Sequence, residues 1–355
     1  MPTDMPKPFD LLREFSKFGA ERNISLRDPD TKSAFGLHVA SEMELALADP
    51  ILLQGQRAEA MFEALVVSLG HYRIIKPEDG GRVHPAIGYR TPDFRVVLQD
   101  GSNWLVEVKN VFEADPRRQR RKLMTKRYRE ELEAYAEATG GELKLAIYWA
   151  RWSIWTVVTP KRLVGADGDL TLDMMTAAKV NELGSLGDLT LGTRPPLELR
   201  LTMDPARTSP IGADGTVLVT IGRAQIFCGN AELTDPVEQQ LAWTLMNYGE
   251  WQLSGPDAAV DGDRLDAIVF RWEPEEDHDQ GFEMIGSLSR IFARYFAEQT
   301  MLSGAVTQLR APVRPEWFEP LKRWQDGDRS LPLWRFMLQP NYDGLAVADH
   351  RDSSA

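Results

Sequence analysis

Cysteine is nearly absent from the sequence, because Cys228 is the only one in 355 residues. A single cysteine excludes an internal disulfide and any zinc cluster built from cysteines. The sequence also lacks the run of about 18 to 20 apolar residues that a membrane-spanning helix needs. No basic region followed by an apolar one opens the chain, so no secretory signal is predicted. We therefore expect a soluble, cytoplasmic protein without a membrane partner.

Positive charge is in short supply as well, since the formal net charge is -12 at pH 7. Most proteins that bind nucleic acid present a basic surface, so this total argues against that class of partner. The charges are unevenly distributed, however. Eight lysines and arginines lie between residues 117 and 129, whereas residues 232–283 hold fourteen acidic residues and two arginines. The basic segment can therefore bind a phosphate backbone while the acidic region stays away from it.

A length of 355 residues and a hydrophobic content of 43% predict two or three domains. Residues 1–50 carry apolar side chains at helical spacing and are predicted to form a helical N-terminal segment. Residues 51–165 are predicted to form the domain that carries the chemistry. Residues 166–195 are rich in Gly, Asp, Leu and Thr and are predicted to be a linker or irregular segment. Strand and helix patterns in residues 196–355 predict a second, C-terminal α+β domain.

The most informative stretch, residues 91–110, is predicted to form a β-hairpin. Two β-rich runs flank Asp100 and the glycine after it, and this pair is typical of a tight turn. Counting outward from the turn places Asp93 opposite the segment from Glu107 to Lys109. Glu107 and Lys109 are two residues apart on one strand, so their side chains point to the same face. Two carboxylates and one ammonium group therefore converge.

Two carboxylates held close together repel each other, and Lys109 supplies only one opposing charge. A divalent cation would balance the pair, and hard carboxylate oxygens with few other protein ligands suit Mg²⁺ or Mn²⁺. Such an ion polarises a phosphodiester and lowers the pKa of a bound water. Lys109 then orients that water or stabilises the developing charge. Asp93 and Glu107 are therefore the expected metal ligands.

Pro92-Asp93 followed by Glu107-Val108-Lys109 resembles the PD-(D/E)XK nuclease superfamily, which has the restriction-endonuclease-like fold. The resemblance covers about residues 51–160. It implies an α/β (α+β) domain with a mixed central sheet flanked by helices. It also implies that Asp93, Glu107 and Lys109 are catalytic and that the Val108 backbone carbonyl is a further metal ligand.

The same superfamily usually takes a further acidic residue from a preceding helix. Residues 55–70 begin with the pattern Gly-x-x-x-Glu and end in a glycine, which is similar to archaeal Holliday-junction resolvases. By that spacing Glu59 is the acid that completes or tunes the metal site. Glu63 lies one turn later on the same side of the helix and remains the competitor.

The basic segment is predicted to enter a helix that ends near Ala138. On one face of this helix Arg118, Lys122, Lys126 and Arg129 recur at helical spacing, and we expect them to bind nucleic-acid phosphates. The other interpretation is a solvated face that pairs with neighbouring glutamates. The resemblance implies a basic side chain from this helix near the scissile phosphate, with Lys122 or Lys126 as the candidate.

The predicted function is a Mg²⁺-dependent endonuclease that hydrolyses phosphodiester bonds in DNA, with RNA left open as a substrate. Cutting both strands of a duplex with one site per chain favours a homodimer. The C-terminal half would supply dimerisation, target recognition or a contact with a protein partner. Additions of this kind to the nuclease fold occur in restriction and phage-defence systems, so defence is expected from the fold alone.

Two alternatives come from different classes of protein. The run from Thr91 to Phe94, followed by that from Val106 to Lys109, is also similar to the nuclease subunit of Tn7-like transposases. That function would require a separate transposase partner. The second alternative is not an enzyme: an inactive nuclease fold would serve as a nucleic-acid-binding or assembly module. Loss of a motif residue would favour it, yet Glu59, Asp93, Glu107 and Lys109 are all in place.

Overall fold

The computed structural model describes residues 8–78, 88–112, 121–314, 316–324 and 329–345. The chain forms two compact units, Met1–Gln56 and Arg57–Ala355. None of the helices in the described ranges is both long and apolar enough to cross a membrane.

The first unit contains a helical hairpin. Helix α1 (Pro8–Arg22) and helix α2 (Thr31–Ala48) pack against each other through aromatic rings. The ring of Phe35 lies with its centroid 5.3 Å from that of Phe15 and 5.4 Å from that of Phe18. Phe15 and Phe18 are three residues apart, so both rings occupy one face of α1. These packing contacts hold the two helices together.

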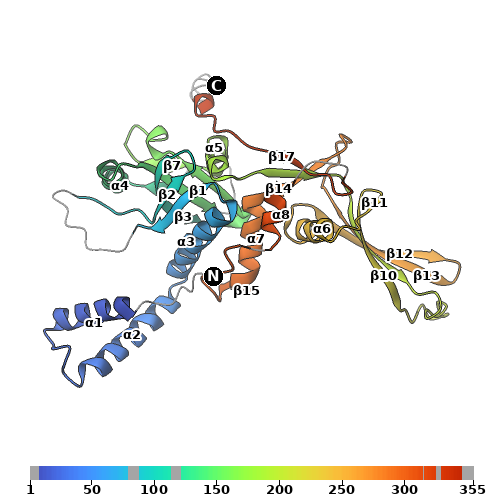
Figure 1. The fold of residues 1–355 in the computed structure, drawn as a ribbon, viewed down its shortest axis with the longest axis horizontal. Coiled ribbons are helices and arrows are strands. Elements are labelled where there is room, and N and C mark those ends of the chain that lie inside the picture. The colour runs from blue at the N-terminus through green and yellow to red at the C-terminus, as the bar shows by residue number, and fades with distance from the viewer. Residues whose placement is uncertain (1–7, 79–87, 113–120, 315, 325–328, 346–355) are drawn as a thin grey trace. The chain divides into compact units, whose positions relative to one another are not determined.

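The second unit begins within helix α3 (Pro50–Leu69) and continues into a mixed sheet. In the described residues this sheet has five strands in the order β1-β2-β3-β5-β6, of which β3 and β5 are parallel neighbours. Helix α4 (Lys126–Ala138) forms part of the crossover that parallel strands require (Figure 1). The strands are β1 (Tyr72–Pro77), β2 (Phe94–Leu98), β3 (Asn103–Val111), β5 (Glu142–Trp149) and β6 (Ile154–Val158).

Alternate residues of β3 point into two separate cores. Trp104, Val106 and Val108 pack with α3 in the larger core, whereas Leu105 and Val111 pack with α4 in the smaller one. This alternation follows from the two-residue period of a β-strand. The sheet is therefore a central layer with a helix on each face. The predicted fold class, α+β with a mixed central sheet flanked by helices, is confirmed.

The predicted basic helix differs from the structure in its first half. Residues after 120 form strand β4 (Arg121–Met124), which pairs antiparallel with β7 (Leu170–Leu172). Helix α4 starts only after Thr125, whose hydroxyl accepts a hydrogen bond from the Tyr128 N–H at 3.3 Å. This N-cap ends the extended segment and fixes the first turn of the helix. The lysines and arginines before Thr125 therefore do not lie on a helix in the described residues, despite their helical spacing.

Residues 166–195 are more ordered than their composition predicts. The side chains of Leu183, Leu186 and Leu191 are fully buried in the larger core. Their burial depends on contacts with distant strands and helices, which a local composition cannot show. The segment contains these elements: β7, α5 (Met174–Lys179), the 3₁₀ helix η3 (Leu183–Leu186) and β8 (Thr190–Thr193).

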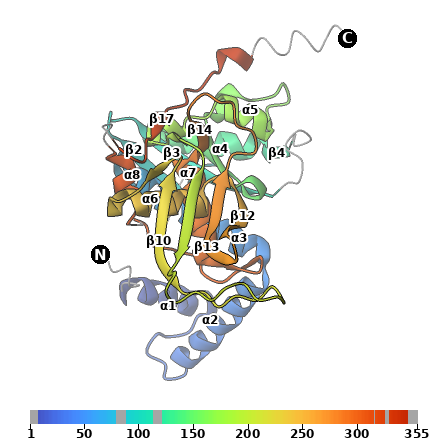
Figure 2. The ribbon, with the colours of Figure 1, turned by 90° about the vertical axis from the view of Figure 1, so that its right-hand side faces the viewer.

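The C-terminal half contains a second sheet and further helices, in agreement with the predicted α+β composition. In the described residues the sheet has the order β11-β10-β9-β13-β12, and its strands β10, β12 and β13 are long (Figure 2). Its strands are β9 (Leu197–Met203), β10 (Ile221–Cys228), β11 (Ala231–Glu232), β12 (Gln252–Asp261) and β13 (Arg264–Glu273).

Helix α6 contacts β10 of the second sheet, helix α7 contacts β6 of the first sheet and β14, and smaller elements complete the unit. Strands β14 and β17 pair with β8 on its two sides. The bounds are α6 (Pro236–Tyr248), β14 (Glu283–Ser287), α7 (Leu288–Thr300), β15 (Met301–Leu302), β16 (Ala305–Val306), α8 (Phe318–Lys322) and β17 (Trp334–Phe336), with 3₁₀ helices η1 (Ala150–Trp152), η2 (Pro160–Arg162) and η4 (Asp343–Leu345).

The larger core runs without interruption from α3 and the first sheet into α6 and α7. At its centre the ring of Phe62 lies 5.6 Å from that of Trp155, centroid to centroid. On the other side of α3, Arg57 Nε donates to Thr300 Oγ1 of α7 at 2.8 Å. The two halves of this unit thus share one core, and the boundary predicted between residues 51–165 and the C-terminal domain stays a prediction.

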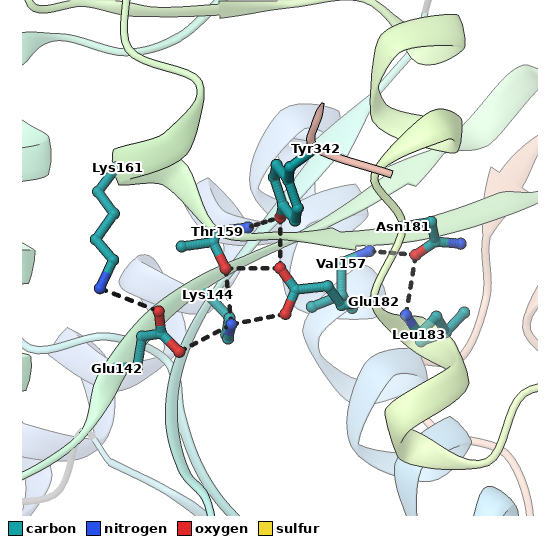
Figure 3. Close-up of polar contacts among 9 residues, drawn as sticks. All are labelled: Glu142, Lys144, Val157, Thr159, Lys161, Asn181, Glu182, Leu183 and Tyr342. Atoms are coloured by element: carbon teal, nitrogen blue, oxygen red, sulfur yellow. Dashed lines mark hydrogen bonds and ion pairs between the residues drawn. The ribbon is translucent and has the colours of Figure 1, made fainter. Parts of the chain in front are cut away.

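A buried polar network also ties the C-terminal end to the first sheet (Figure 3). Lys144 Nζ of β5 donates to Thr159 Oγ1 and to Glu182 Oε2, each at 2.7 Å. The Tyr342 hydroxyl donates to Glu182 and accepts from the Thr159 N–H at 2.8 Å. Each buried charge in this network has a partner. We therefore interpret the network as structural: it attaches the segment around Tyr342 to the first sheet.

Candidate active site

The β2–β3 hairpin closes at the predicted turn. Gly101 has a φ of +93°, a conformation that glycine adopts without the steric cost of a Cβ. Its N–H donates to the Leu98 carbonyl at 3.1 Å, and the Ser102 N–H donates to Asp100 Oδ1 at 2.8 Å. The turn sets the register in which the residues of β2 pair with those of β3.

That register brings Asp93 to the Glu-Val-Lys segment. Phe94 pairs with Val106, so the residue before Phe94 lies beside Glu107. The Val108 N–H donates to Asp93 Oδ2 at 2.7 Å. Asp93 therefore lies opposite the segment that was expected from the hairpin, and a main-chain hydrogen bond holds it there.

Glu107 is buried, with 4% of its surface exposed, and has two partners. Lys109 Nζ binds its Oε1 at 2.5 Å, in agreement with two side chains on the same face of β3. The hydroxyl of Tyr128, at the start of α4, donates to the same oxygen and accepts from Lys109 Nζ at 3.3 Å. Glu107, Lys109 and Tyr128 thus form one connected group between β3 and α4.

The electrostatics at Asp93 are those of a crowded acidic site. Burial raises the pKa of Asp93, and the charge of Glu107 raises it further, to about 7, against the Val108 hydrogen bond, which lowers it. Burial alone would lower the pKa of Lys109, but the charge and hydrogen bond of Glu107 outweigh it and raise that pKa. Lys109 is therefore a cation at neutral pH and does not take up a proton from water.

The helix acid also contributes to the electrostatics of the site. Glu59 lies on α3, and its charge adds to the raised pKa of Asp93. This interaction favours Glu59 over Glu63 as the acid that belongs to the site. In the ranges that the structure describes, no three side chains of His, Cys, Asp or Glu are grouped closely enough to hold one metal ion. Glu59 as a metal ligand stays a prediction.

The donor atoms that are present suit a hard divalent cation. Asp93 and Glu107 offer carboxylate oxygens, and their mutual repulsion is the kind of cost that a cation removes. Mg²⁺ is commonly held by one or two carboxylates and completes its shell with water and substrate phosphate. Two carboxylates therefore suffice as a protein ligand set. The carbonyl of Val108 remains a predicted further ligand.

Two residues at this site were not identified from the sequence. Tyr128 lies on α4, and its contact with the motif residues depends on how α4 packs on the sheet. Arg90 lies three residues before Asp93, and its Cζ lies 4.4 Å from the centroid of the Tyr128 ring. The only feature of the sequence that pointed to Arg90 was its position close to the Pro-Asp pair.

The four basic residues predicted to bind nucleic acid do not form one helix face. Lys122 is on strand β4, and Arg118 lies outside the described residues. The Arg129 side chain is 10% exposed and pairs with Glu133. The Lys126 side chain is 60% exposed at the start of α4. Of the three predicted residues that the structure describes, Lys122 and Lys126 are exposed to solvent. For these two a contact with nucleic acid stays a prediction.

Comparison with known proteins yielded no match to a family model and none to a curated protein. Among solved structures, the chain is similar to Hjc, a Holliday junction resolvase from the archaeal hyperthermophile Archaeoglobus fulgidus. The sequence identity is 18% and the TM-score 0.26, over 34% of this chain and 89% of the resolvase chain. The functional assignment therefore depends on the geometry of the site itself.

Proposed function

We propose that this protein is a divalent-metal-dependent endonuclease that hydrolyses phosphodiester bonds in DNA. The observation that carries the proposal is the meeting of Asp93, Glu107 and Lys109 at one end of the β2–β3 hairpin. A Glu-x-Lys pair on an ordinary strand surface is exposed and worth little. Here Glu107 is buried, and a second carboxylate is held beside it. Such an arrangement lowers stability unless a cation and a phosphate use it.

Each residue has a role in the proposed reaction. Asp93 and Glu107 hold the metal, Glu59 completes or tunes the site, and the Val108 carbonyl is a further ligand. When bound, the ion polarises the phosphodiester and lowers the pKa of the attacking water. Lys109, as a cation, orients that water and stabilises the negative charge that develops on the phosphate. The Val108 N–H fixes the orientation of the Asp93 carboxylate.

The proposal also covers the oligomeric state, the role of the C-terminal half and the biological system. Cutting both strands of a duplex with one such site per chain favours a homodimer. The C-terminal half, which shares a core with the first sheet, would then carry dimerisation, target recognition or partner binding. Restriction or phage defence is the setting proposed for an enzyme of this kind.

The test is a cleavage assay on supercoiled DNA, linear DNA, single-stranded DNA and RNA, with Mg²⁺, Mn²⁺ or EDTA. The variants are Asp93→Asn and Lys109→Ala. Asp100→Asn serves as the matched control, because this acid lies on the same hairpin but is exposed in the turn. We expect cleavage of DNA by wild type and control with metal only, and a loss of at least about 100-fold in the other two variants.

Each outcome has a definite meaning. Cleavage that persists in EDTA would exclude a metal-dependent reaction. Unchanged cleavage by the folded Asp93→Asn and Lys109→Ala variants would place the active site elsewhere. Binding of DNA by wild type without cleavage under any of these conditions would replace the proposal by the non-enzymatic module, or by a subunit that needs a transposase partner.

A further inference from the structure

Arg90 stands at the rim of the candidate site, in the short segment that leads to Asp93. Its main-chain N–H donates to the Glu131 carbonyl of α4 at 3.1 Å. Its Nε lies 3.5 Å from Glu131 Oε2, and half of the side chain, 49%, is exposed. Arg90 is therefore fixed at its main chain and at the Nε edge of its guanidinium group, and about half of the side chain remains exposed.

The ring of Tyr128 connects Arg90 with the motif lysine. Arg90 Cζ and Lys109 Nζ lie 4.4 Å and 5.0 Å from the centroid of this one ring. A cation over an aromatic face is attracted to it, and a planar guanidinium group can also stack on it. The Tyr128 hydroxyl at the far end of the ring binds Glu107. One side chain of α4 thus positions a cation at the rim and a carboxylate inside the site.

The local charges leave this rim positive. Glu131 is shared by two arginines, because Arg127 Nε also binds it at 2.8 Å. Arg90, Arg127 and Glu131 together carry one net positive charge. Deeper in the site the charges are mainly negative, from Glu59, Asp93 and Glu107, and would repel an incoming phosphate in the absence of metal. A polyanionic strand that approaches this rim therefore meets a net positive charge, to which Arg90 contributes.

We propose that Arg90 binds a backbone phosphate of the nucleic acid next to the scissile phosphate, and that the Tyr128 ring positions its guanidinium group for that contact. Within the described part of the chain, Nη1 and Nη2 of Arg90 have no hydrogen-bond partner, and these two donors match the oxygens of one phosphate. This inference deepens the proposed function and rests on it. Arg90 is assigned to substrate binding, and Tyr128 is a positioning residue.

The test measures KM and kcat for cleavage of a short DNA duplex, and the salt dependence of binding in Ca²⁺ with the Lys109→Ala background. For Arg90→Ala we expect KM to rise roughly tenfold with kcat within about twofold. The slope of log K against log salt should fall by about one. Arg22→Ala is the matched control, because this exposed arginine of the first unit also lies over an aromatic ring, with its Cζ 4.1 Å from the centroid of the Phe18 ring; it should change neither.

Two further variants separate binding from structure. Arg90→Lys keeps the charge and the pairing with Glu131 but lacks the two-pronged donor, so KM should remain raised severalfold. Tyr128→Phe keeps the ring, so KM should stay near wild type, whereas kcat falls because Glu107 loses a hydrogen bond. Recovery of wild-type KM in Arg90→Lys, or a loss of kcat alone in Arg90→Ala, would show that Arg90 only anchors the segment before Asp93.

The two proposals fail in different ways. If wild type cuts DNA and Arg90→Ala has an unchanged KM and salt slope, the inference about Arg90 is wrong and the nuclease assignment stands. If wild type neither binds nor cuts nucleic acid with any metal, the proposed function is wrong and the role of Arg90 falls with it. If wild type binds without cutting, the salt slope alone decides the role of Arg90.

Discussion

At the scale of single residues, Asp93 is the clearest case of function opposing stability. Its carboxylate is half-buried beside Glu107, with Glu59 near enough to add to the repulsion. Buried like charges lower the free energy of unfolding, and removing one of them often stabilises a protein. The same repulsion gives the site its affinity for a cation, so metal binding and stability should be linked.

We expect Asp93→Asn to raise the melting temperature in EDTA by about 2 °C, which corresponds to roughly 1 kcal/mol in a chain of this size. The asparagine Oδ1 can still accept from the Val108 N–H, so the hairpin keeps its hydrogen bond. Millimolar Mg²⁺ should raise the melting temperature of wild type and leave that of the variant unchanged. Scanning fluorimetry with and without Mg²⁺ measures both effects. Equal shifts in the two proteins would exclude Asp93 as a ligand.

Glu78 makes the opposite contribution to stability. Burial would raise its pKa, but hydrogen bonds from Arg95, Lys76 and Tyr135 lower it to about 2. A lowered pKa in the folded state adds stability above the unfolded pKa, near 4.5, and this is lost as the pH falls towards 2.

We therefore expect Glu78→Gln to cost roughly 3 kcal/mol at neutral pH, with the difference from wild type shrinking between pH 4.5 and pH 2. Urea unfolding at several pH values measures this difference. A constant difference across that range would mean that the loss comes from packing and not from the charge of Glu78.

At the scale of elements, the β2–β3 hairpin determines where the site residues meet. Its register depends on the turn, in which Gly101 takes a positive φ. A slip of one residue would move Glu107 and Lys109 to the opposite face of the sheet. The hairpin was predictable because an Asp-Gly turn and two alternating strands are local features.

For Gly101→Ala we expect a loss of about 1 kcal/mol, because alanine is strained at a φ of +93°. The new methyl group meets no atom within 4 Å, so the cost comes from the backbone alone. Gly101→Asn should cost less, since asparagine tolerates this region better. Chemical denaturation ranks the three proteins, and a larger loss in the asparagine variant would contradict the explanation.

The start of α4 shows the limit of reasoning from elements. Lysines and arginines at helical spacing predicted a helix from before Lys122, yet β4 pairs with β7 there and α4 begins after Thr125. The pairing partner lies more than forty residues further along the chain, at Leu170–Leu172. A local period cannot show a long-range strand pairing, and such pairing overrides helix propensity.

At the scale of the whole molecule, the larger core joins the first sheet to the C-terminal helices. Phe62 is fully buried within it and contacts the rings of Phe94 and Trp155. Helix α7 contributes Phe292 and Phe296 to the same core. A shared core predicts that Arg57–Ala355 unfolds as one cooperative unit.

We expect Phe62→Ala to lower the free energy of unfolding by about 3 to 5 kcal/mol, because it leaves a cavity in this core. Hydrogen exchange should speed up together in peptides from β5 and from α7. Phe112→Ala is the control, since that side chain is 68% exposed. Faster exchange confined to residues 57–165 would instead support two separate domains, as the composition predicts.

The resemblance to the nuclease superfamily implied the mixed sheet with flanking helices. The patterns of the sequence itself were sufficient for the helical segment before Pro50, for helix α3, and for the meeting of Asp93 with the Glu-Val-Lys segment. All of these depend on local periods, turn residues and strand register, which short stretches of sequence encode. Only the tertiary structure decided the rest. It ordered residues 166–195, placed the start of the basic helix at Thr125, and brought Tyr128 and Arg90 to the site, because each depends on contacts between residues far apart in the chain.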